Sequence, residues 1–536
     1  MSKCFSFPTQ TKMRSSLLII SLLLVSSCYR LMAQKTEQPS LDTLTKYLPE
    51  LSQPIRIEFS YYSNKDNTLI PIGEDGLILI KDSEKREKKL KIWDIICLDT
   101  LLQEQWKIEI PVKRTENLIG YDYVNEELLL LIGKYQHRGQ FRVLKVDRNR
   151  GVVKEHNLKL PVDLNLSHLS MVRHGIVFGG TSFGRPVLVF YDLLADKPVV
   201  VSGIYNVESR LLGIETSEKY GLFSVLINEV TKQKDYSISI KVYDLTGQLV
   251  YSNSLKTEAE RSLIDATTTS YPDGTQFVSG TYSDDNKRSS IGFYVAKIQG
   301  GEQQFIKYYP FSELENFYNY LSAKKSKRIK NRAERKRIRG KKLKQSYSLL
   351  VHDIIKKNEE FVLIGEAYYP RYASMMDNSF MSTGSYSSSS FASTQTVRVL
   401  LGYQFTHAIM VGFDNNGEVQ WDNSFGITKE LKTSLEENVD VSIQPDNIII
   451  FYVEGNEINA KAMNRKSELS PEMSIDIRLS NLADKLVQGR SETQGIVHWY
   501  RTNHLVYGHQ KIKYTQVRKK KDRSRNVFFI NLLRID

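Results

Sequence analysis

The sequence predicts an all-β fold, namely a single β-propeller of about eight four-stranded blades, with seven blades as the alternative. Three observations predict it: an apolar motif with a glycine that recurs about every fifty residues, a turn motif that follows it, and a strand without a local partner at each end of the repeats. The composition agrees, because 41% hydrophobic residues and 30 tyrosines indicate a folded chain rich in strands.

The first motif is a short apolar run that carries a glycine. It occurs at residues 130–135, 177–180, 277–282, 362–365 and 505–508, with degenerate copies at 77–81, 222–227 and 448–453. Glycine inside a strand usually weakens it, so its recurrence at one place indicates close packing of neighbouring sheets. These eight copies predict eight blades, and each blade must stack on its neighbours to bury both faces.

The second motif is a tight turn in which an aspartate precedes a glycine. The copies are Asp244 with Gly247, Asp414 with Gly417 and Trp421, and a looser one at residues 147–151. The aspartate carboxylate caps such a turn, and the glycine supplies the positive φ that closes it. We therefore expect β-hairpins at these positions, with a structural role for the turn residues.

The ends of the repeats predict how the ring closes. The final repeat lacks an outermost strand after residues 526–535, and the strand-like run at residues 55–59 has no partner before it. Pairing these two segments would satisfy both sheet edges. The propeller is therefore expected to span residues 54–536.

The hairpin from Asp414 to Trp421, followed by Phe425 and Gly426, resembles hairpins of exported bacterial propeller repeats and of propeller lipoproteins that scaffold outer-membrane assembly. The resemblance covers the chain from about residue 55 onward, is clear in two blades and implies the fold but no ligand. Sialidase-type propellers have a shorter Asp-x-Gly turn, and quinoprotein propellers have one more residue between Asp and Gly. The resemblance therefore implies neither class, and we expect no cofactor.

The N-terminus predicts export. Residues 1–33 read as a signal peptide, with Lys3, Lys12 and Arg14 before an apolar run at 17–25 that is too short to span a membrane. Two processing sites compete: lipidation at Cys28, as in bacterial lipoproteins, or cleavage after Ala33. Both place the protein in the periplasm or at the outer membrane. Residues 34–53 are expected to be a linker with a short helix, and no later run is long and apolar enough for an integral protein.

Only one cysteine is certain to remain after processing. Cleavage after Ala33 removes Cys4 and Cys28 and leaves Cys97, so no intramolecular disulfide can form. Cys97 lies in an apolar, strand-like run. We expect a buried, unreactive thiol.

The net charge of +13 is concentrated in two segments. Residues 324–344 hold thirteen lysines and arginines and one acid, Glu334, and residues 518–525 hold six bases and one acid. Without these segments the chain is slightly acidic. The first segment is the candidate contact for an anionic surface or partner, and its bases are Lys324, Lys325, Lys327, Arg328, Lys330, Arg332, Arg335, Lys336, Arg337, Arg339, Lys341, Lys342 and Lys344.

This basic segment belongs to an insertion at residues 312–345, which we expect to be helical. Ser312 and Glu315 fit a capping box, and the apolar residues at 314, 317, 318 and 321 share one helical face that would pack on the propeller. Gly340 is expected to end the basic half. Its partner would be lipid headgroups, lipopolysaccharide or an acidic protein complex. A solvated charge run is the alternative, and export and the lack of interleaved aromatics argue against nucleic acid.

A second insertion spans residues 369–404, between the second and third strands of the sixth repeat. Its centre is mainly serine and threonine, which predicts a flexible loop. The alternative is a loop that orders on a partner through Phe380, Tyr386 and Phe391.

No sequence motif indicates catalysis or a metal site, so the catalytic residues are unknown. His498, His504 and His509 have gaps of six and five, wider than metal-binding motifs use. We expect a non-enzymatic scaffold or interaction propeller of the envelope. The alternatives are a glycan- or ligand-binding propeller, or a carbohydrate-active hydrolase or lyase. Converging carboxylates or histidines in the central channel would favour these alternatives, and an apolar or closed channel would favour scaffolding.

Overall fold

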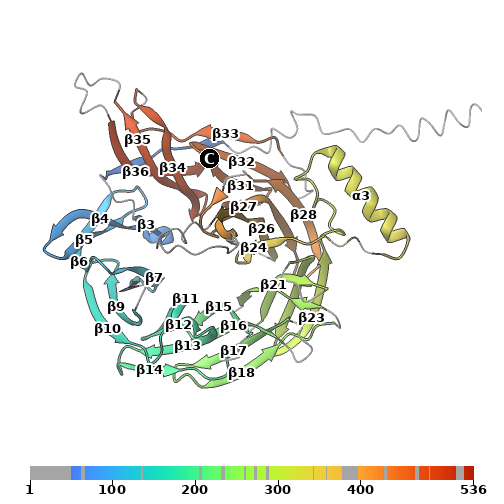
Figure 1. Cartoon of the computed structure of the whole chain (residues 1–536), viewed down its shortest axis with the longest axis horizontal. Helices are drawn as coiled ribbons and strands as arrows, with labels where there is room; N and C mark the ends of the chain where they lie inside the picture. The colour runs from blue at the N-terminus through green and yellow to red at the C-terminus, as the bar shows by residue number, and fades with distance from the viewer. Residues whose placement is uncertain are drawn as a thin grey trace, which may run out of the picture.

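The structure is a computed structural model that describes residues 50–536, except for residues 62–66, 135–136, 205–207, 231–235, 259–260, 271–274, 285–288, 342, 344, 358, 377–395, 428–430, 465–469, 482 and 515–523. The described chain forms a ring of eight β-sheets (Figure 1). The predicted eight-bladed propeller is confirmed, and the seven-bladed alternative is wrong.

Blades I to IV are antiparallel sheets of four strands that follow one another from the centre of the ring outward (Figure 1). Blade I holds β3 (Asn67–Pro71), β4 (Leu77–Glu87), β5 (Leu90–Leu98) and β6 (Glu104–Lys113), with a 3-10 turn at Gly73–Asp75. Blade II holds β7 (Asn117–Val124), β8 (Glu127–Lys134), β9 (His137–Asp147) and β10 (Val153–Lys159). Blade III holds β11 (Asn165–Val172), β12 (Gly175–Ser182), β13 (Arg185–Asp192) and β14 (Lys197–Val200), and blade IV holds β15 (Arg210–Ser217), β16 (Leu222–Val230), β17 (Tyr236–Asp244) and β18 (Leu249–Ser254).

Three of the remaining four blades carry additional strands. Blade V holds β19 (Ser262–Leu263), β20 (Thr267–Ser270), β21 (Gln276–Ser283), β22 (Gly292–Gln299) and β23 (Glu302–Pro310). Blade VI holds β24 (Ser348–Val351), β25 (Ile355–Lys357), β26 (Glu360–Met376), β27 (Thr396–Phe413), β28 (Val419–Gly426) and β29 (Leu431–Lys432). Blade VII holds β30 (Val439–Ile443), β31 (Asn447–Glu454), β32 (Glu457–Asn464) and β33 (Met473–Asp476). Blade VIII holds β34 (Lys485–Tyr500), β35 (Asn503–Lys513) and β36 (Ser524–Ile535), with β1 (Leu51–Ser52) and β2 (Arg56–Ser60) at its outer edge.

The ends of the propeller close the ring as predicted. Strand β2 pairs antiparallel with β36, with Arg56 opposite Asn531 and Phe59 opposite Phe528. The shorter β1 pairs with the end of the same strand. Two segments more than 400 residues apart in sequence therefore share one sheet, and the edge of β36 is paired rather than exposed.

The core lies between the blades. Ile78 of β4 and Leu130 of β8 belong to one apolar cluster that joins blades I and II. Leu77 of β4 and Leu505 of β35 belong to another, which joins blades I and VIII across the closure. In the described part of the chain, every blade buries both faces in this way, which explains why the repeats must stack.

The recurrent glycines lie on the second strand of a blade. A Cβ on Gly180 would clash with the carbonyl oxygen of Asn165, and one on Gly508 would clash with that of Glu492. Both oxygens belong to the innermost strand of the same blade. The close approach expected between neighbouring sheets is therefore, at these positions, an approach within one sheet. Gly179 does face the next blade, where its Cβ would meet Leu211.

The first insertion was predicted to be helical throughout, but its first half is not a helix. Residues 312–321 form turns rather than a helix. The carbonyl of Phe317, which a helix would use for its own hydrogen bonds, accepts instead from the hydroxyl of Ser424 in blade VI. The apolar side chains of this segment are nevertheless buried against the ring, as expected: Phe317 is 0% exposed.

The basic half is helical. Helix α3 (Ala323–Ile338) follows Ser322 and spans about 24 Å at 1.5 Å per residue. Gly340 ends it as predicted, with φ of +66°. The N–H of Lys341 binds the carbonyl of Lys336 at 2.8 Å, and that of Gly340 binds the carbonyl of Arg337 at 2.9 Å. This is the Schellman pattern, which glycine favours. The helix lies outside the ring, beside β28 (Figure 1).

Much of the second insertion is strand rather than loop. Strands β26 and β27 pair as far as Met376 and Thr396, so residues 369–376 and 396–404 extend the hairpin of blade VI. The tyrosines, valines and leucines of these segments favour a paired strand. The predicted contact residues Phe380, Tyr386 and Phe391 lie outside the described residues.

The N-terminal predictions also lie mostly outside the described residues, which begin at Glu50. They comprise the signal peptide at residues 1–33, Cys28, and the linker with its short helix up to residue 49. Within the described residues, no helix combines the length and apolarity needed to span a bilayer.

Candidate functional site

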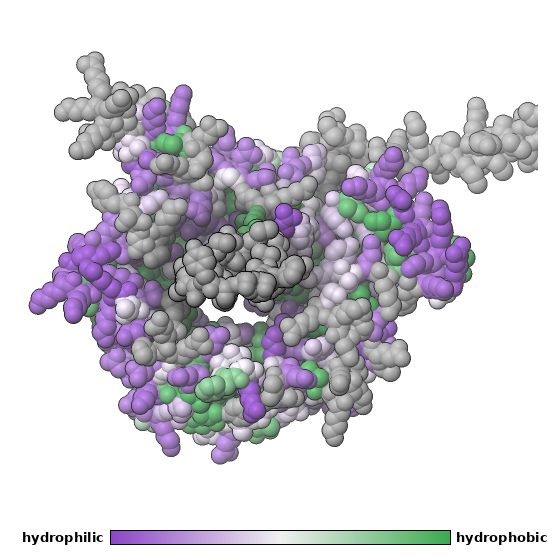
Figure 2. Space-filling view, viewed as in Figure 1, coloured by the Kyte–Doolittle hydropathy of each residue, from purple (hydrophilic) through white to green (hydrophobic). Residues whose placement is uncertain are grey.

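Helix α3 is the most basic surface of the described chain. Its sixteen residues include nine lysines and arginines and a single acid, Glu334, and none of them is buried. Figure 2 shows the helix as a strongly hydrophilic projection from the rim. Among its described bases, the ion pair recorded is that of Arg337 with Glu334, at 3.0 Å. Arg339 and Lys341 follow the helix and are exposed, and Lys342 and Lys344 lie outside the described residues.

The helix turns one narrow face toward the ring. Ser326, Ile329 and Ala333 are partly shielded, and Ile329 packs against the apolar cluster of blades V and VI. Lys324, Lys327, Arg328 and Arg335 are exposed on the rest of the surface.

The segment before α3, residues 311–321, is hydrogen-bonded to blade VI. We call this segment the stem. The carboxylate of Asp422 accepts the N–H of Glu315 at 3.0 Å and that of Asn316 at 2.7 Å. The hydroxyl of Ser424 donates to the carbonyl of Phe317 at 2.6 Å. Burial raises the pKa of Asp422, and the two backbone N–H donors partly oppose this.

Aromatic rings complete the anchor of the stem. The imidazole of His407, on β27, stacks on Tyr320 with 3.6 Å between ring centres and 3° between planes. Phe317 and Tyr347 meet the same imidazole edge-on. His407 is 1% exposed, and burial lowers its pKa to about 3, so the ring is neutral at ordinary pH. The stem is thus held by both polar and apolar contacts, and α3 starts from a fixed point.

The predicted hairpin turns are confirmed as structural elements. Asp244 accepts the N–H of Thr246 at 2.8 Å, and Gly247 has φ of +77°. Asp414 accepts the N–H of Asn416 at 2.9 Å, and Gly417 has φ of +73°. A Cβ on Gly417 would press on Phe305 of blade V, so this turn also packs between blades. Trp421 is 5% exposed, and its indole donates to Glu360 at 2.5 Å.

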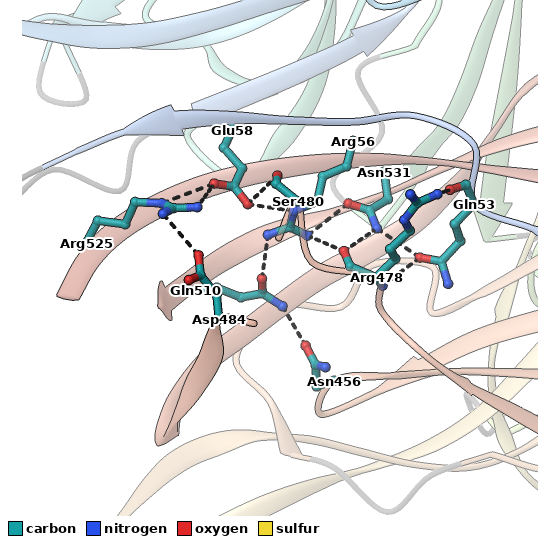
Figure 3. Close-up of polar contacts among 10 residues, drawn as sticks. All are labelled: Gln53, Arg56, Glu58, Asn456, Arg478, Ser480, Asp484, Gln510, Arg525 and Asn531. Atoms are coloured by element: carbon teal, nitrogen blue, oxygen red, sulfur yellow. Dashed lines mark hydrogen bonds and ion pairs between the residues drawn. The ribbon is translucent and has the colours of Figure 1, made fainter. Parts of the chain in front are cut away.

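A polar network, which we call the latch, fastens β2 to the end of the chain (Figure 3). The guanidinium of Arg56 donates to Glu58 at 2.7 Å, to Asn531 at 2.9 Å and to Gln510 at 2.8 Å. Arg525 donates to the other oxygen of Glu58 at 2.6 Å. Burial lowers the pKa of Arg56. Burial opposes ionisation of Glu58 too, but hydrogen bonds from Arg56 and Arg525 dominate and lower its pKa.

The three C-terminal histidines do not form one cluster, although the rings of two of them are in contact. The rings of His498 and His504 are 5.3 Å apart, and His504 pairs with Asp440 at 2.6 Å. His509 instead contacts Asn67 at 2.8 Å. In the described part of the chain no group of three histidine, cysteine or carboxylate side chains is arranged to hold a metal ion. Cys97 is buried as predicted, and burial raises the pKa of its thiol.

A second group of titratable residues, beside the channel, was not predicted from the sequence. His352 donates to Glu366 at 2.8 Å and lies 3.8 Å from Glu437. Burial opposes protonation of His352, but Glu366 and Glu437 raise its pKa above the usual value. These residues come from β26 and from two inter-strand connections. Only the adjacency of Glu436 and Glu437 was visible in the sequence, and such a pair is common on surfaces.

Comparison with known proteins assigns no family. No family model matches the chain, and no curated protein matches it. Among solved structures it is similar to a europium-containing methanol dehydrogenase, with 9% identity over 93% of this chain and 95% of that chain and a TM-score of 0.43. It is also similar to a quinohemoprotein alcohol dehydrogenase from Pseudomonas putida (9% identity, 93% and 77% covered, TM-score 0.42). A polysaccharide lyase gives 8% identity, 90% and 100% covered, and a TM-score of 0.38. Similarity this low says nothing of activity or ligand, and the propeller assignment rests on the eight sheets themselves.

Proposed function

We propose that the chain is an exported interaction propeller that docks through α3 onto an anionic surface of the bacterial envelope. The observation that carries the proposal is the set of nine bases with one acid on a helix whose stem is fixed to blade VI. A solvated charge run has no need of such an anchor.

Physical reasoning supports a fixed helix as the docking element. A helix that is already folded and anchored loses little conformational freedom when it binds. Each lysine or arginine near an anionic surface contributes about 1 kcal/mol, although the contributions do not add linearly. The ring then acts as a platform, and a partner complex at the outer membrane would meet its other faces. Export is supported by the signal-peptide pattern of residues 1–33.

Vesicle co-sedimentation of the mature chain tests the proposal. A variant with four exposed bases of α3 replaced by glutamine, Lys324, Lys327, Arg328 and Arg335, should bind phosphatidylglycerol vesicles at least tenfold more weakly than wild type. The matched control replaces four exposed lysines of other blades, Lys89, Lys154, Lys159 and Lys197, and so has the same net charge. The control variant should bind phosphatidylglycerol vesicles within twofold of wild type. Neither wild type nor the two variants should bind phosphatidylcholine vesicles.

Two results would contradict the proposal. Equal loss of binding in both variants would mean that net charge, rather than α3, attracts the protein. Absence of binding by wild type at low salt would exclude an anionic lipid surface, because such attraction is strongest there.

A further inference from the structure

A cavity of about 740 Å³ lies on the inner side of the ring. The innermost strands β3, β7 and β34 supply part of its wall. The segment at residues 431–438, which runs from β29 of blade VI to blade VII, supplies most of the rest. Figure 2 shows the opening through the middle of the ring. Ligand pockets of proteins usually measure about 300–1,000 Å³, so the volume suits a short oligosaccharide.

Two tyrosines give the cavity an aromatic surface. Tyr121, from β7, is 43% exposed, and Tyr507, from β35, lies near it and near Glu436. Burial raises the pKa of both hydroxyls. The charge of Glu436 raises the pKa of Tyr121 further, and Tyr121 and Glu436 do the same for Tyr507. The hydroxyls therefore stay neutral and can both donate and accept, while the ring faces offer apolar area.

The rest of the lining is polar in the way that suits hydroxyl groups. It includes three amides, four alcohols and three carboxylates, among them Gln494, Thr493, Glu436 and Glu437. Amides and carboxylates can each make two hydrogen bonds to neighbouring hydroxyls of a sugar ring. The side-chain nitrogen of Asn438 is buried and has no hydrogen-bond partner among the described residues.

The charge of the cavity restricts the ligand. Lys432 is the single base in the described lining, against three carboxylates. Two further carboxylates, Glu366 and Asp440, lie just behind. Burial raises the pKa of Glu437, and Glu366 and Asp440 raise it further, despite the opposing effect of His352. An anionic ligand such as a uronic acid or a sugar phosphate would add to this repulsion.

We propose that this cavity binds a short saccharide that is neutral or carries amino groups. The site is separate from α3, which lies outside the ring beside β28. Its occupation is therefore independent of docking, and it gives the exported propeller a soluble or surface glycan to recognise.

Isothermal titration of the mature chain tests the site with a defined set of oligosaccharides. The set contains trimers of glucose, galactose, mannose, N-acetylglucosamine and glucosamine, with trigalacturonate as the anionic probe and spermidine as a cation without a sugar ring. At least one neutral or amino trimer should bind, and trigalacturonate should not. Tyr121→Ala should weaken the binding of that trimer at least tenfold, because the substitution removes an exposed aromatic ring from the cavity wall.

The matched control is Tyr220→Ala, a tyrosine 55% exposed that is not part of the cavity lining. It should leave binding within twofold of wild type, and thermal unfolding should show that both variants are folded. The proposal is overturned if no trimer binds, if trigalacturonate binds as well as the neutral trimers, or if spermidine matches the best trimer. The last result would make the cavity a binding site for cations rather than for sugars.

Discussion

His407 couples the anchor of α3 to pH. The ring stacks on Tyr320, and its Nε2 atom is buried without a partner among the described residues. Burial lowers its pKa to about 3, whereas an unfolded histidine titrates near 6.5. Between these two pH values His407 is protonated in the unfolded chain and neutral in the folded chain. Stability should therefore fall as the pH drops below about 6.5, by roughly 2 kcal/mol at pH 5 for a fully buried group.

Replacing His407 by glutamine should remove part of this acid sensitivity. We expect the slope of unfolding free energy against pH, measured by urea denaturation between pH 5 and 7, to become shallower in His407→Gln. The matched control is His156→Gln, a partly exposed histidine of β10, which should keep the wild-type slope. An unchanged slope in His407→Gln would show that another group carries the acid sensitivity.

At the scale of the element, the latch adds polar contacts to the strand pairing and apolar packing that close the ring. Glu58 accepts hydrogen bonds from Arg56 and Arg525 and is itself nearly buried. Its pKa is lowered in the fold, so its contribution is present above the unfolded value of about 4.3 and is lost as the pH falls through the folded value. Glu58→Gln should lower the unfolding free energy at pH 7 by about 2 kcal/mol.

The control for the latch is Glu104→Gln, an exposed carboxylate at the start of β6. It should change the unfolding free energy by less than about 0.5 kcal/mol. If the two variants unfold at the same urea concentration, the polar network of Figure 3 contributes little, and closure rests on backbone pairing and apolar packing.

The elements that the sequence predicted well are those determined by local patterns. The turns at Asp244 and Asp414 need only an aspartate, a glycine and the flanking strands. Residues 312–321 were wrongly predicted as a helix because their backbone is held by β28, about a hundred residues later in the chain: Ser424, for example, donates to the carbonyl of Phe317. The channel cavity was not predictable either, because blades distant in sequence supply its lining and no local pattern records which side chains converge.

At the scale of the whole molecule, two features are proposed to hold the ring at a membrane, namely helix α3 and a lipid at Cys28. The described chain enters at the outer edge of blade VIII, where β1 pairs with β36. Helix α3 leaves from the connection between blades V and VI. If Cys28 is lipidated, the lipid and α3 act together, and each raises the effective concentration of the other at the surface.

Cell fractionation separates these contributions. In one variant a glycine-serine linker replaces residues 323–338 and so removes the charge proposed for docking. A larger share of this variant than of wild type should be found in the soluble periplasmic fraction. The stem, which ends before α3, keeps its anchor in this variant, so the ring should remain folded. Cys28→Ala should add to the release if the cysteine is lipidated and should have no effect if cleavage follows Ala33. A soluble distribution for wild type and both variants would rule out attachment through α3 and through a lipid at Cys28, and the proposed docking function would then be wrong.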